Sequence, residues 1–500
     1  MVNTKKELTT FWRKFSKMLD AGMPPLAALD LIRQETGDQL LRAMIDDMKA
    51  AIRSGKTLSE SVARWPSYFT PTIRGLIKAG ETQGILGKVM AKIAEGLEDG
   101  TFEVGKKDAK EDATPDEEAA EADATEAVDA LIQHALERAA SDIHLDWRAG
   151  GLWVRYRIDG VLHEVDPPDA AVQKAVISRL KLMAALDAAE QRLPQDGRAR
   201  LNVGGTEIDL RVACCPYVTG ESVVVRILKR SEPVLGLDKL RLSDGCLETV
   251  HGWLRRSTGL VLVTGPMGSG KTTTLYSMLQ ELNSGDRKIV TSEDPVEFQM
   301  DGINQMPINP RLGLTYAQTI RAQLRQAPNV ILVGETRDLE TAQLVTQAAL
   351  TGHLVLSTLH TNDAPGTVRR LLDMGVAPCL LNGALVGVLG QRLVRVICSH
   401  CKEEHEPEAW LREYAGNVDG PFYRGTGCEH CHQTGYRGRA GIHEAMEPDD
   451  ATRALIAKDA NLGALQKQAV KSGMVPLRDD GIAKAKEGLT TLDEVVRATS

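Results

Sequence analysis

The sequence predicts a mixed α/β protein with an all-helical segment at its front and a sheet of parallel strands at its back. Three patterns support this prediction. Apolar residues near the N-terminus recur at three- and four-residue steps, residues 153–165 alternate between apolar and polar, and from about residue 236 short apolar runs alternate with helical ones. A chain of 500 residues with 42% apolar residues has material for about three domains, each with its own core.

The charge of the chain is concentrated in one segment. Lysine and arginine total 60 against 68 aspartates and glutamates, which gives a net charge of −8. Residues 107–126 hold nine acids against two lysines and contribute −7 of that charge. The remainder is close to neutral, which argues against a chain that coats nucleic acid or anionic lipid through bulk charge.

The sequence contains no recognisable export signal or membrane span. Charges and Trp12 stand where a signal peptide needs an unbroken apolar core. The most apolar run, residues 380–397, is interrupted by Gln391, Arg392 and Arg395. We therefore expect a soluble protein that stays in the cytoplasm.

Residues 1–100 are predicted to form a helical bundle. Its first helix is marked by a stripe of apolar residues, namely Leu8, Phe11, Trp12, Phe15, Met18 and Leu19. That helix is stopped by Gly22 and by the prolines at 24–25, and Thr57 followed by Glu60 has the spacing of a capping box that begins another helix. Such a bundle serves as a docking module or is simply a packed domain, and composition alone favours the second.

The middle of the chain changes character twice. Residues 101–126 lose nearly all large apolar side chains and are predicted to be an acidic flexible linker. Residues 127–232 are predicted to be an α+β domain, because Asp159-Gly160 separates two short apolar runs as in a β-hairpin. Strands around 208–212 and 223–228 and a helix around 171–189 complete it.

Residues 233–395 are predicted to form a nucleotide-binding core. After the apolar run 260–264, residues 265–272 fill every required position of the P-loop pattern. Glycines let the backbone N–H groups turn toward phosphates, Lys271 can reach the β- and γ-oxygens, and the Thr272 hydroxyl can bind Mg²⁺. The predicted nucleotide-binding residues are Gly265, Pro266, Met267, Gly268, Ser269, Gly270, Lys271, Thr272 and Thr273.

Acids follow two further apolar runs of this core. The run 329–334 ends at Glu335, and the run 289–292 is followed by Glu293, Asp294 and Glu297. Carboxyl ends of parallel strands meet at one edge of a sheet, so one of these acids could polarise the attacking water. A fourth run, 354–359, lies between two histidines. Either of them, His353 or His360, would sense the γ-phosphate or merely cap the sheet.

Residues 396–445 are predicted to be a zinc module, and residues 446–500 a helical C-terminal subdomain. The two Cys-x-x-Cys pairs are Cys398 with Cys401 and Cys428 with Cys431. Four sulfur ligands with no open position are typical of structural Zn²⁺. Redox pairing is the alternative, and weaker alternative ligands are His400, His405, His430 and His432. We expect free thiols at Cys214, Cys215, Cys246 and Cys379.

From about Ala135 to its C-terminus the chain resembles the type II secretion and type IV pilus assembly ATPase family. No single motif carries the resemblance. The matching stretches are ASDIH (140–144), VRYRIDG (154–160), LPQDGR (193–198), DLRV (209–212), EDPVE (293–297), GETRD (334–338), TLHTN (358–362), QRL (391–393) and GRAGI (438–442). The resemblance implies a RecA-like P-loop ATPase domain, preceded by a PAS-like α+β domain, that hydrolyses ATP with Mg²⁺ in hexameric rings.

The resemblance also implies roles for residues at matching positions. Glu297 is the expected catalytic base with Glu293 second, Glu335 is the expected Walker B acid near Mg²⁺, and His360 is the histidine-box residue. Two arginines, Arg211 and Arg226, match residues that approach the nucleotide at a domain or subunit boundary. Such arginines would stabilise negative charge on the γ-phosphate and couple hydrolysis to motion. The tetracysteine module is typical of members that assemble or secrete, and is absent from retraction ATPases.

The chain departs from the family pattern at three places in this region. Ala327-Pro328-Asn329 stands where Asp-Pro-Asp is usual, Thr336 replaces an aliphatic residue, and Cys214-Cys215-Pro216 replaces a small polar pair. None of these changes removes a phosphate or metal group.

The front of the chain resembles a different protein. Residues 11–98 are similar to a cytoplasmic domain of the inner-membrane platform protein F of the same secretion systems, through LDAGMP (19–24), GKTLSE (55–60) and AGETQG (79–84). This implies a fusion of a platform-like domain with a motor that is peripheral to the inner membrane, and a platform protein as its partner.

Three functions are compatible with these observations. The first is an ATP-driven hexameric motor of type II secretion or type IV pilus assembly. The second is an assembly adapter, in which nucleotide acts as a structural clamp with little turnover. The third is a conjugation-type ATPase stimulated by nucleic acid, which the near-neutral body and the cysteine module disfavour.

Overall fold

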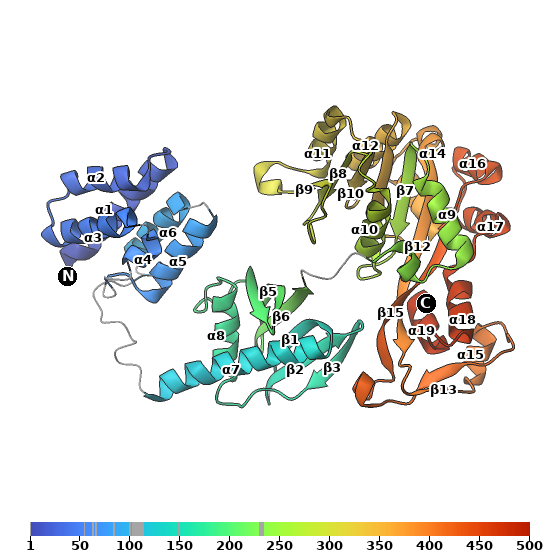
Figure 1. Cartoon of the computed structure of the whole chain (residues 1–500), viewed down its shortest axis with the longest axis horizontal. Helices are drawn as coiled ribbons and strands as arrows, with labels where there is room; N and C mark the ends of the chain where they lie inside the picture. Colours follow the sequence, from blue (N-terminus) through green and yellow to red (C-terminus); the bar gives the residue numbers. More distant parts are fainter. Residues whose placement is uncertain are drawn as a thin grey trace. The chain divides into compact units, whose positions relative to one another are not determined.

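The computed structural model describes residues 2–54, 56–62, 65, 68–83, 86–99, 102, 115–148, 150–229 and 235–500 (Figure 1). The chain divides into two compact units, residues 1–229 and residues 230–500. The first unit holds the helical bundle and the α+β domain, and the second holds the P-loop and the cysteines. In the described ranges, no helix has both the length and the apolar character needed to cross a membrane.

The helical bundle is present at the front of the chain, as predicted. Its described helices are α1 (Val2–Asp20), α2 (Pro25–Glu35), α3 (Gln39–Arg53), α4 (Leu58–Val62), α5 (Pro71–Gln83) and α6 (Leu86–Asp99). Aromatic side chains form the centre of its core, where Trp12 is fully buried against Phe11, Phe15 and Phe69. The predicted capping box at the start of α4 is confirmed in both directions: the Thr57 N–H donates to Glu60 Oε2 at 2.9 Å, and the Glu60 N–H donates to Thr57 Oγ1 at 3.2 Å.

The flexible linker predicted over residues 101–126 is wrong in its second half. Helix α7 spans Pro115–Glu137, so residues 115–126 are helical, whereas residues 103–114 lie outside the described part. In the sequence, a proline followed by acids is a pattern typical of the start of a helix. The alanines between those acids favour a helix, and Val128 and Ile132 bury its end in the domain core.

The α+β domain is a six-stranded sheet with two helices. Its strands are β1 (Ala140–Arg148), β2 (Gly151–Ile158), β3 (Val161–Val165), β4 (Gln195–Val203), β5 (Thr206–Tyr217) and β6 (Gly220–Lys229), and α8 spans Gln173–Met183. The order is β3-β2-β1-β6-β5-β4, with every neighbouring pair antiparallel. The predicted hairpin is confirmed, because Ile158 pairs with Val161 around Asp159 and Gly160, which both have positive φ.

The predicted parallel sheet forms the core of the second unit. Its order is β15-β12-β7-β11-β10-β8-β9, and only the pairing of β15 with β12 is antiparallel. The strands are β7 (Gly259–Thr264), β8 (Ile289–Glu293), β9 (Ile303–Pro307), β10 (Val330–Val333), β11 (Leu354–Leu359), β12 (Leu385–Ile397) and β15 (Tyr436–Met446). The fully buried apolar runs of β7, β10 and β11 are typical of strands covered on both faces.

Helices cover both faces of this sheet (Figure 1). They are α9 (Asp244–Leu254), α10 (Lys271–Leu282), α11 (Tyr316–Gln323), α12 (Leu339–Leu350), α13 (Ala364–Asp373) and α14 (Pro378–Ala384). The first two pack on one face, and the other four on the opposite face. Short 3-10 helices lie at Leu237–Leu240, Pro310–Leu312, Leu324–Gln326 and Glu429–Cys431. This arrangement brings the carboxyl ends of β7, β8, β10 and β11 to one edge of the sheet.

Two predicted boundaries differ from the structure. Residues 396–445 are predicted to form the zinc module, but residues 436–445 belong to strand β15, which pairs with β12 in the main sheet. The module itself holds β13 (Lys402–Glu404), α15 (Ala409–Tyr414) and β14 (Tyr423–Gly425).

The predicted C-terminal subdomain (446–500) also divides, because its helices bury their apolar sides in different cores. Helices α16 (Asp450–Ala457) and α17 (Leu462–Lys471) pack on the main core, whereas α18 (Leu477–Lys486) and α19 (Leu492–Thr499) pack with Leu411 and Phe422 of the module.

Candidate functional site

The predicted phosphate-binding loop connects β7 to the first residue of α10, Lys271. Its glycines adopt conformations that other residues avoid, with φ of 152° at Gly265, 76° at Gly268 and 88° at Gly270. A Cβ atom at Gly265 would lie 2.5 Å from the backbone oxygen of Gln391. The loop therefore needs glycine both for its turns and for its close approach to β12.

Lys271 is held inside this loop. Its Nζ donates to the backbone oxygens of Gly265 and Pro266, at 2.8 and 2.9 Å. Burial lowers the pKa of Lys271 to about 8, although the nearby Glu335 carboxylate favours the charged form. Carbonyl oxygens thus hold the ammonium group where a P-loop lysine meets phosphate oxygens. The next two residues, Thr272 and Thr273, are exposed on the first turn of α10.

Glu335 and His360 lie next to this lysine. Glu335 follows β10, and its side chain is 14% exposed and forms an ion pair with Arg337. His360 follows β11, and its Nδ1 lies 3.4 Å from Lys271 Nζ while its Nε2 lies 3.5 Å from Glu335 Oε2. The structure thus brings together three of the residues that the sequence singled out.

Hydroxyl groups fix the strand ends on which these residues stand. Thr264, the last residue of β7, shares a hydrogen bond of 2.6 Å with the Thr361 hydroxyl beside His360. Thr336, one of the departures from the family pattern, is buried, and its hydroxyl lies 2.9 Å from that of Ser357. A threonine is therefore accommodated at this position by a polar partner.

The two predicted candidates for the catalytic base have different surroundings. Glu293 is 4% exposed, and its carboxylate accepts hydrogen bonds from Tyr276, from Thr291 at 2.6 Å and from Gln305 at 3.1 Å. Burial, together with the hydrogen bond to Glu293, raises the pKa of Tyr276. Glu297 is exposed, and its N–H donates to the Tyr276 hydroxyl at 3.3 Å. This arrangement favours Glu297 as a base and gives Glu293 a role in holding the acidic loop.

The two predicted arginines belong to the first unit of the chain. Arg211 on β5 and Arg226 on β6 are direct partners in the sheet register and line a cavity of about 470 Å³ together with Asp196 and Arg198. Arg226 Nε donates to Asp142 Oδ1 at 2.9 Å. Burial alone would raise the pKa of Asp142, but the hydrogen bonds from Arg226 and a serine outweigh it and keep this pKa below its usual value.

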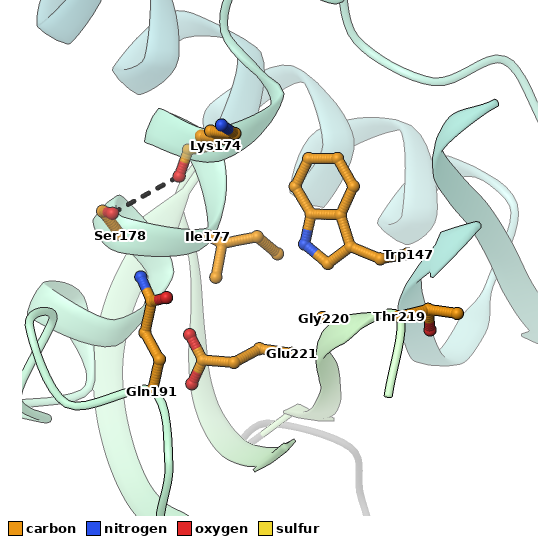
Figure 2. A pocket seen from close by; sticks show the side chains of 8 residues that line it. All are labelled: Trp147, Lys174, Ile177, Ser178, Gln191, Thr219, Gly220 and Glu221. Atoms are coloured by element: carbon orange, nitrogen blue, oxygen red, sulfur yellow. Dashed lines mark hydrogen bonds between the residues drawn. The ribbon is translucent and has the colours of Figure 1, made fainter. Parts of the chain in front are cut away.

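A second cavity of about 340 Å³ lies in the same domain (Figure 2). Figure 2 shows Trp147 and Ile177 on its apolar side, and Gln191 and Glu221 on its polar side. Glu221 is already neutralised, because its Oε1 accepts a hydrogen bond of 2.7 Å from the fully buried Lys181. The other charged residue of the lining is Lys174.

The four predicted zinc ligands converge in the module between β12 and β15. The sulfur atoms of Cys398, Cys401, Cys428 and Cys431 all lie within 4.8 Å of one another. Neighbouring sulfurs are 3.7–3.8 Å apart, which is too long for a disulfide of about 2.05 Å. It is the edge length of a tetrahedron whose centre lies about 2.3 Å from each sulfur, the usual zinc–sulfur distance. The donor set therefore fits a closed structural zinc site.

Backbone N–H groups favour the thiolate form of one of these cysteines, Cys431. Burial alone would raise the pKa of Cys431, but N–H donors from Cys428 and Gly435, each 3.2 Å from its sulfur, lower it to about 7. The rings of His400 and His430 stack with their centroids 3.9 Å apart outside the sulfur cluster. The cysteines expected to be free, Cys214, Cys215, Cys246 and Cys379, form no disulfide.

Sequence reasoning missed Tyr276 and the contact of Gln391 with the P-loop. Tyr276 lies on the buried side of α10, where its spacing is that of an ordinary core aromatic. Gln391 did leave a signal, because it interrupts an otherwise apolar strand. Its amide donates to the carbonyl of Ser269 in the phosphate-binding loop.

A P-loop at the carboxyl end of a central parallel strand, with an acid after another parallel strand of the same sheet, defines a RecA-like P-loop ATPase. Residues 117–497 match the family model described as "Type II/IV secretion system protein", so the chain belongs to that family and is an ATPase of it. Residues 11–107 match a second model, described as "Type II secretion system (T2SS), protein F". Both matches agree with the resemblances found in the sequence.

Relatives and solved structures support this assignment. The chain is 48% identical over 375 residues to the type II secretion system ATPase E of Vibrio cholerae, covering 74% of each chain. It is 47% identical over 380 residues to the type IV pilus assembly ATPase PilB of Myxococcus xanthus, covering 75% of this chain and 67% of that protein. The X-ray structure of the Legionella pneumophila ATPase DotB matches 73% of this chain and 93% of that chain with a TM-score of 0.56 at 21% identity, which supports the fold alone.

Proposed function

We propose that this chain is a Mg²⁺-dependent, hexameric ATP-hydrolysing motor that powers type II protein secretion or type IV pilus assembly. The observation that carries the proposal is the contact of His360 with both Lys271 and Glu335 at the carboxyl edge of the parallel sheet. A P-loop lysine and a metal-binding acid are groups that phosphoryl transfer in P-loop ATPases uses, and His360 lies against both.

In this proposal each residue has a distinct role. The N–H groups of the loop and the start of α10 bind the phosphates, and Lys271 moves from the Gly265 and Pro266 carbonyls to the β- and γ-oxygens. The Thr272 hydroxyl and Glu335 hold Mg²⁺, which when bound supplies positive charge that offsets charge on the phosphates. Glu297 takes the proton of the attacking water. Because it is exposed, it needs the closure of another element to work away from bulk solvent.

The arginine pair suggests what supplies that closure. Arg211 and Arg226 stand in the first unit of the chain, whereas the P-loop stands in the second. We propose that they reach the γ-phosphate across a boundary and stabilise its developing charge, so that hydrolysis depends on ring assembly.

A mixing experiment distinguishes an arginine that acts within one chain from one that acts on its neighbour. Lys271→Ala and Arg226→Lys chains, each inactive alone, are combined and allowed to reassemble. If the arginine acts on a neighbour, mixed rings contain sites with an intact lysine and an intact arginine, and activity returns. If it acts within its own chain, no activity returns. Arg200→Ala is the matched control. It removes another arginine of the same sheet, one that pairs with Asp209, and should stay active without mixing.

The other modules suggest where the motor works. We propose that the four cysteines bind one structural Zn²⁺, and that the front bundle, which matches protein F, meets an inner-membrane platform protein or the ring itself. The motor would then be cytoplasmic and peripheral to the inner membrane. Because the bundle and the motor belong to one chain, docking of the bundle on the platform protein would hold the ring at the secretion or pilus machine that the ring drives.

The proposal is tested by secretion or piliation in cells that carry Lys271→Ala as their only copy. Loss of P-loop function should abolish both, with the protein still present at its normal level. Normal secretion or piliation with this variant would favour an assembly adapter that does not need turnover.

A further inference from the structure

The glutamine at position 391, on strand β12, contacts the phosphate-binding loop. Gln391 is 2% exposed, and it follows Gly390, which lies opposite Thr264 in the pairing of β12 with β7. Its Nε2 donates a hydrogen bond of 2.6 Å to the backbone oxygen of Ser269. The reverse orientation of the amide would place two acceptors against each other, so this contact determines which end of the amide faces the loop.

This contact restrains one peptide plane of the loop. The Ser269 carbonyl and the Gly270 N–H belong to a single planar trans peptide, in which the two groups point in opposite directions. A donor that holds the carbonyl toward β12 therefore turns the Gly270 N–H to the other side. In a P-loop, the N–H groups of the glycines have to point at the phosphates.

Without such a restraint the peptide would be free to turn. Gly270 has a φ of 88° and lacks the Cβ atom that limits other residues. A Cβ there would lie 3.2 Å from Gln391 Nε2, so the loop backbone rests directly on the amide. Two buried polar atoms beside the contact, Ser269 Oγ and Gln391 Oε1, have no hydrogen-bond partner among the described residues. The Ser269–Gly270 peptide is therefore held at its carbonyl by Gln391, while these two polar atoms next to it make no hydrogen bond within the described part of the chain.

We propose that Gln391 is a positioning residue for phosphate binding: its amide holds the Ser269–Gly270 peptide so that the Gly270 N–H faces the nucleotide. It acts through the loop and does not touch the substrate. This role explains why a buried strand contains an amide side chain, which is costly to bury unless it is hydrogen-bonded. The inference rests on the proposed phosphate-binding function of residues 265–273.

The test is a titration of the full-length, zinc-loaded chain with Mg·ADP, measured by calorimetry. Gln391→Met keeps the volume of the side chain and removes the donor, and we expect its Kd to rise about tenfold, which corresponds to about 1.4 kcal/mol. Gln173→Met is the matched control. The Gln173 amide is 7% exposed and donates to the Pro168 carbonyl at 2.9 Å in the other unit of the chain, so its loss should leave the Kd unchanged.

A second variant tests the donor without changing the shape of the side chain. In Gln391→Glu the neutral carboxyl group can donate to the Ser269 carbonyl, but the carboxylate cannot. The Kd of this variant, relative to wild type, should therefore rise as the pH increases from about 6 to about 8.5, since buried carboxyl groups titrate in this range. For Gln391→Met the same ratio should stay constant.

Two results would overturn the proposal while leaving the phosphate site intact. One is an unchanged Kd in a folded Gln391→Met variant, with binding still abolished by Lys271→Ala. The other, which decides if Gln391→Met does not fold, is a pH-independent ratio for Gln391→Glu. Absence of Mg·ADP binding to the wild-type chain would instead contradict the proposed function, and the inference with it.

Discussion

The carboxylate of Glu335 lies against the imidazole of His360, with 3.5 Å between Oε2 and Nε2. The other ring nitrogen of His360 lies 3.4 Å from Lys271 Nζ. One imidazole thus spans the distance between the P-loop lysine and the acid after β10. The His360 side chain is 46% exposed. Under the proposed function, it would contact the γ-phosphate while it contacts both groups.

Replacement of this histidine should impair turnover more than binding. We expect His360→Ala to lower kcat by about 10- to 100-fold, as for loss of a group that stabilises charge in the transition state, while the Kd for Mg·ADP changes little. His353→Ala is the control, since His353 Nδ1 lies 3.0 Å from the Ala348 carbonyl at the far end of the same strand. Equal losses of kcat in the two variants would contradict a role for His360 at the γ-phosphate.

Nucleotide affinity should depend on pH through Lys271. Burial lowers the pKa of this lysine to about 8 in the nucleotide-free protein. Phosphate oxygens favour the ammonium form, so binding raises this pKa and takes up a proton when the pH is above about 8. Affinity for Mg·ATP should therefore weaken as the pH rises through about 8 to about 9.

The sign of the effect of Lys271 on stability follows from the same shift. The lysine of the unfolded chain, with a pKa near 10.5, binds its proton more tightly than that of the native chain. Between the two pKa values this residue therefore makes the free energy of unfolding increase with pH.

Calorimetry of nucleotide binding at about pH 8.5, in buffers of different ionisation enthalpy, measures the proton uptake on binding. The absence of uptake would contradict the shifted pKa of Lys271.

The two glutamates of the acidic loop should respond differently to the same substitution. In Glu293→Gln the new amide would place N–H groups against the hydroxyl donors of Tyr276 and Thr291. We expect the free energy of unfolding to fall by about 1–3 kcal/mol, the cost of unsatisfied buried polar groups. Glu297→Gln, at an exposed position, should change it by less than about 0.5 kcal/mol. Urea denaturation measures both, and equal stability of the two variants would refute the difference in roles.

Loss of one sulfur ligand should loosen the packing of the zinc module. Leu411 and Phe422 pack with Ile482 of α18 and Leu492 of α19 in one small core. Without the metal, this core loses its cross-link. We expect Cys398→Ser to lose the single bound zinc and to become sensitive to protease between β12 and β15.

The control for this variant is Cys379→Ser, because Cys379 is an exposed thiol outside the cluster. It should retain one zinc per chain by atomic absorption and should resist protease as the wild type does. A Cys398→Ser protein that keeps a full equivalent of zinc and the same protease pattern would show that the cluster is not a metal site.

Local patterns were sufficient to predict β7, β8, β10, β11 and the P-loop. The apolar runs of β7 and β10 are followed by a glycine, β8 ends in an acid, and the spacing of residues 265–272 demands one loop geometry. The capping box between Thr57 and Glu60 was predictable for the same reason, since its two partners are three residues apart. Interactions between residues that are close together in the chain can therefore be predicted from the sequence.

Features that depend on distant contacts were not predictable. Glu293 and Glu297 stand in one stretch, but only the first is buried, where its carboxylate accepts hydrogen bonds from Tyr276 on α10 and Gln305 on β9. Strand β15 pairs with β12 across the whole cysteine module, so its place in the main sheet depends on a partner far away in the chain. Helix α7 begins inside an acidic segment whose composition indicates disorder, and its later residues are buried against a sheet that the segment itself does not reveal.

The most direct test of the account is Mg²⁺-dependent ATP hydrolysis across a size-exclusion profile of the wild-type chain, Glu297→Gln and a chain that lacks residues 1–126. The motor predicts hydrolysis confined to a hexamer-sized peak and its loss in Glu297→Gln, with nucleotide still bound. A higher rate after truncation would mean that the front domain restrains the motor. Hydrolysis that is absent from every assembled state, or that persists undiminished in Glu297→Gln, would contradict the account.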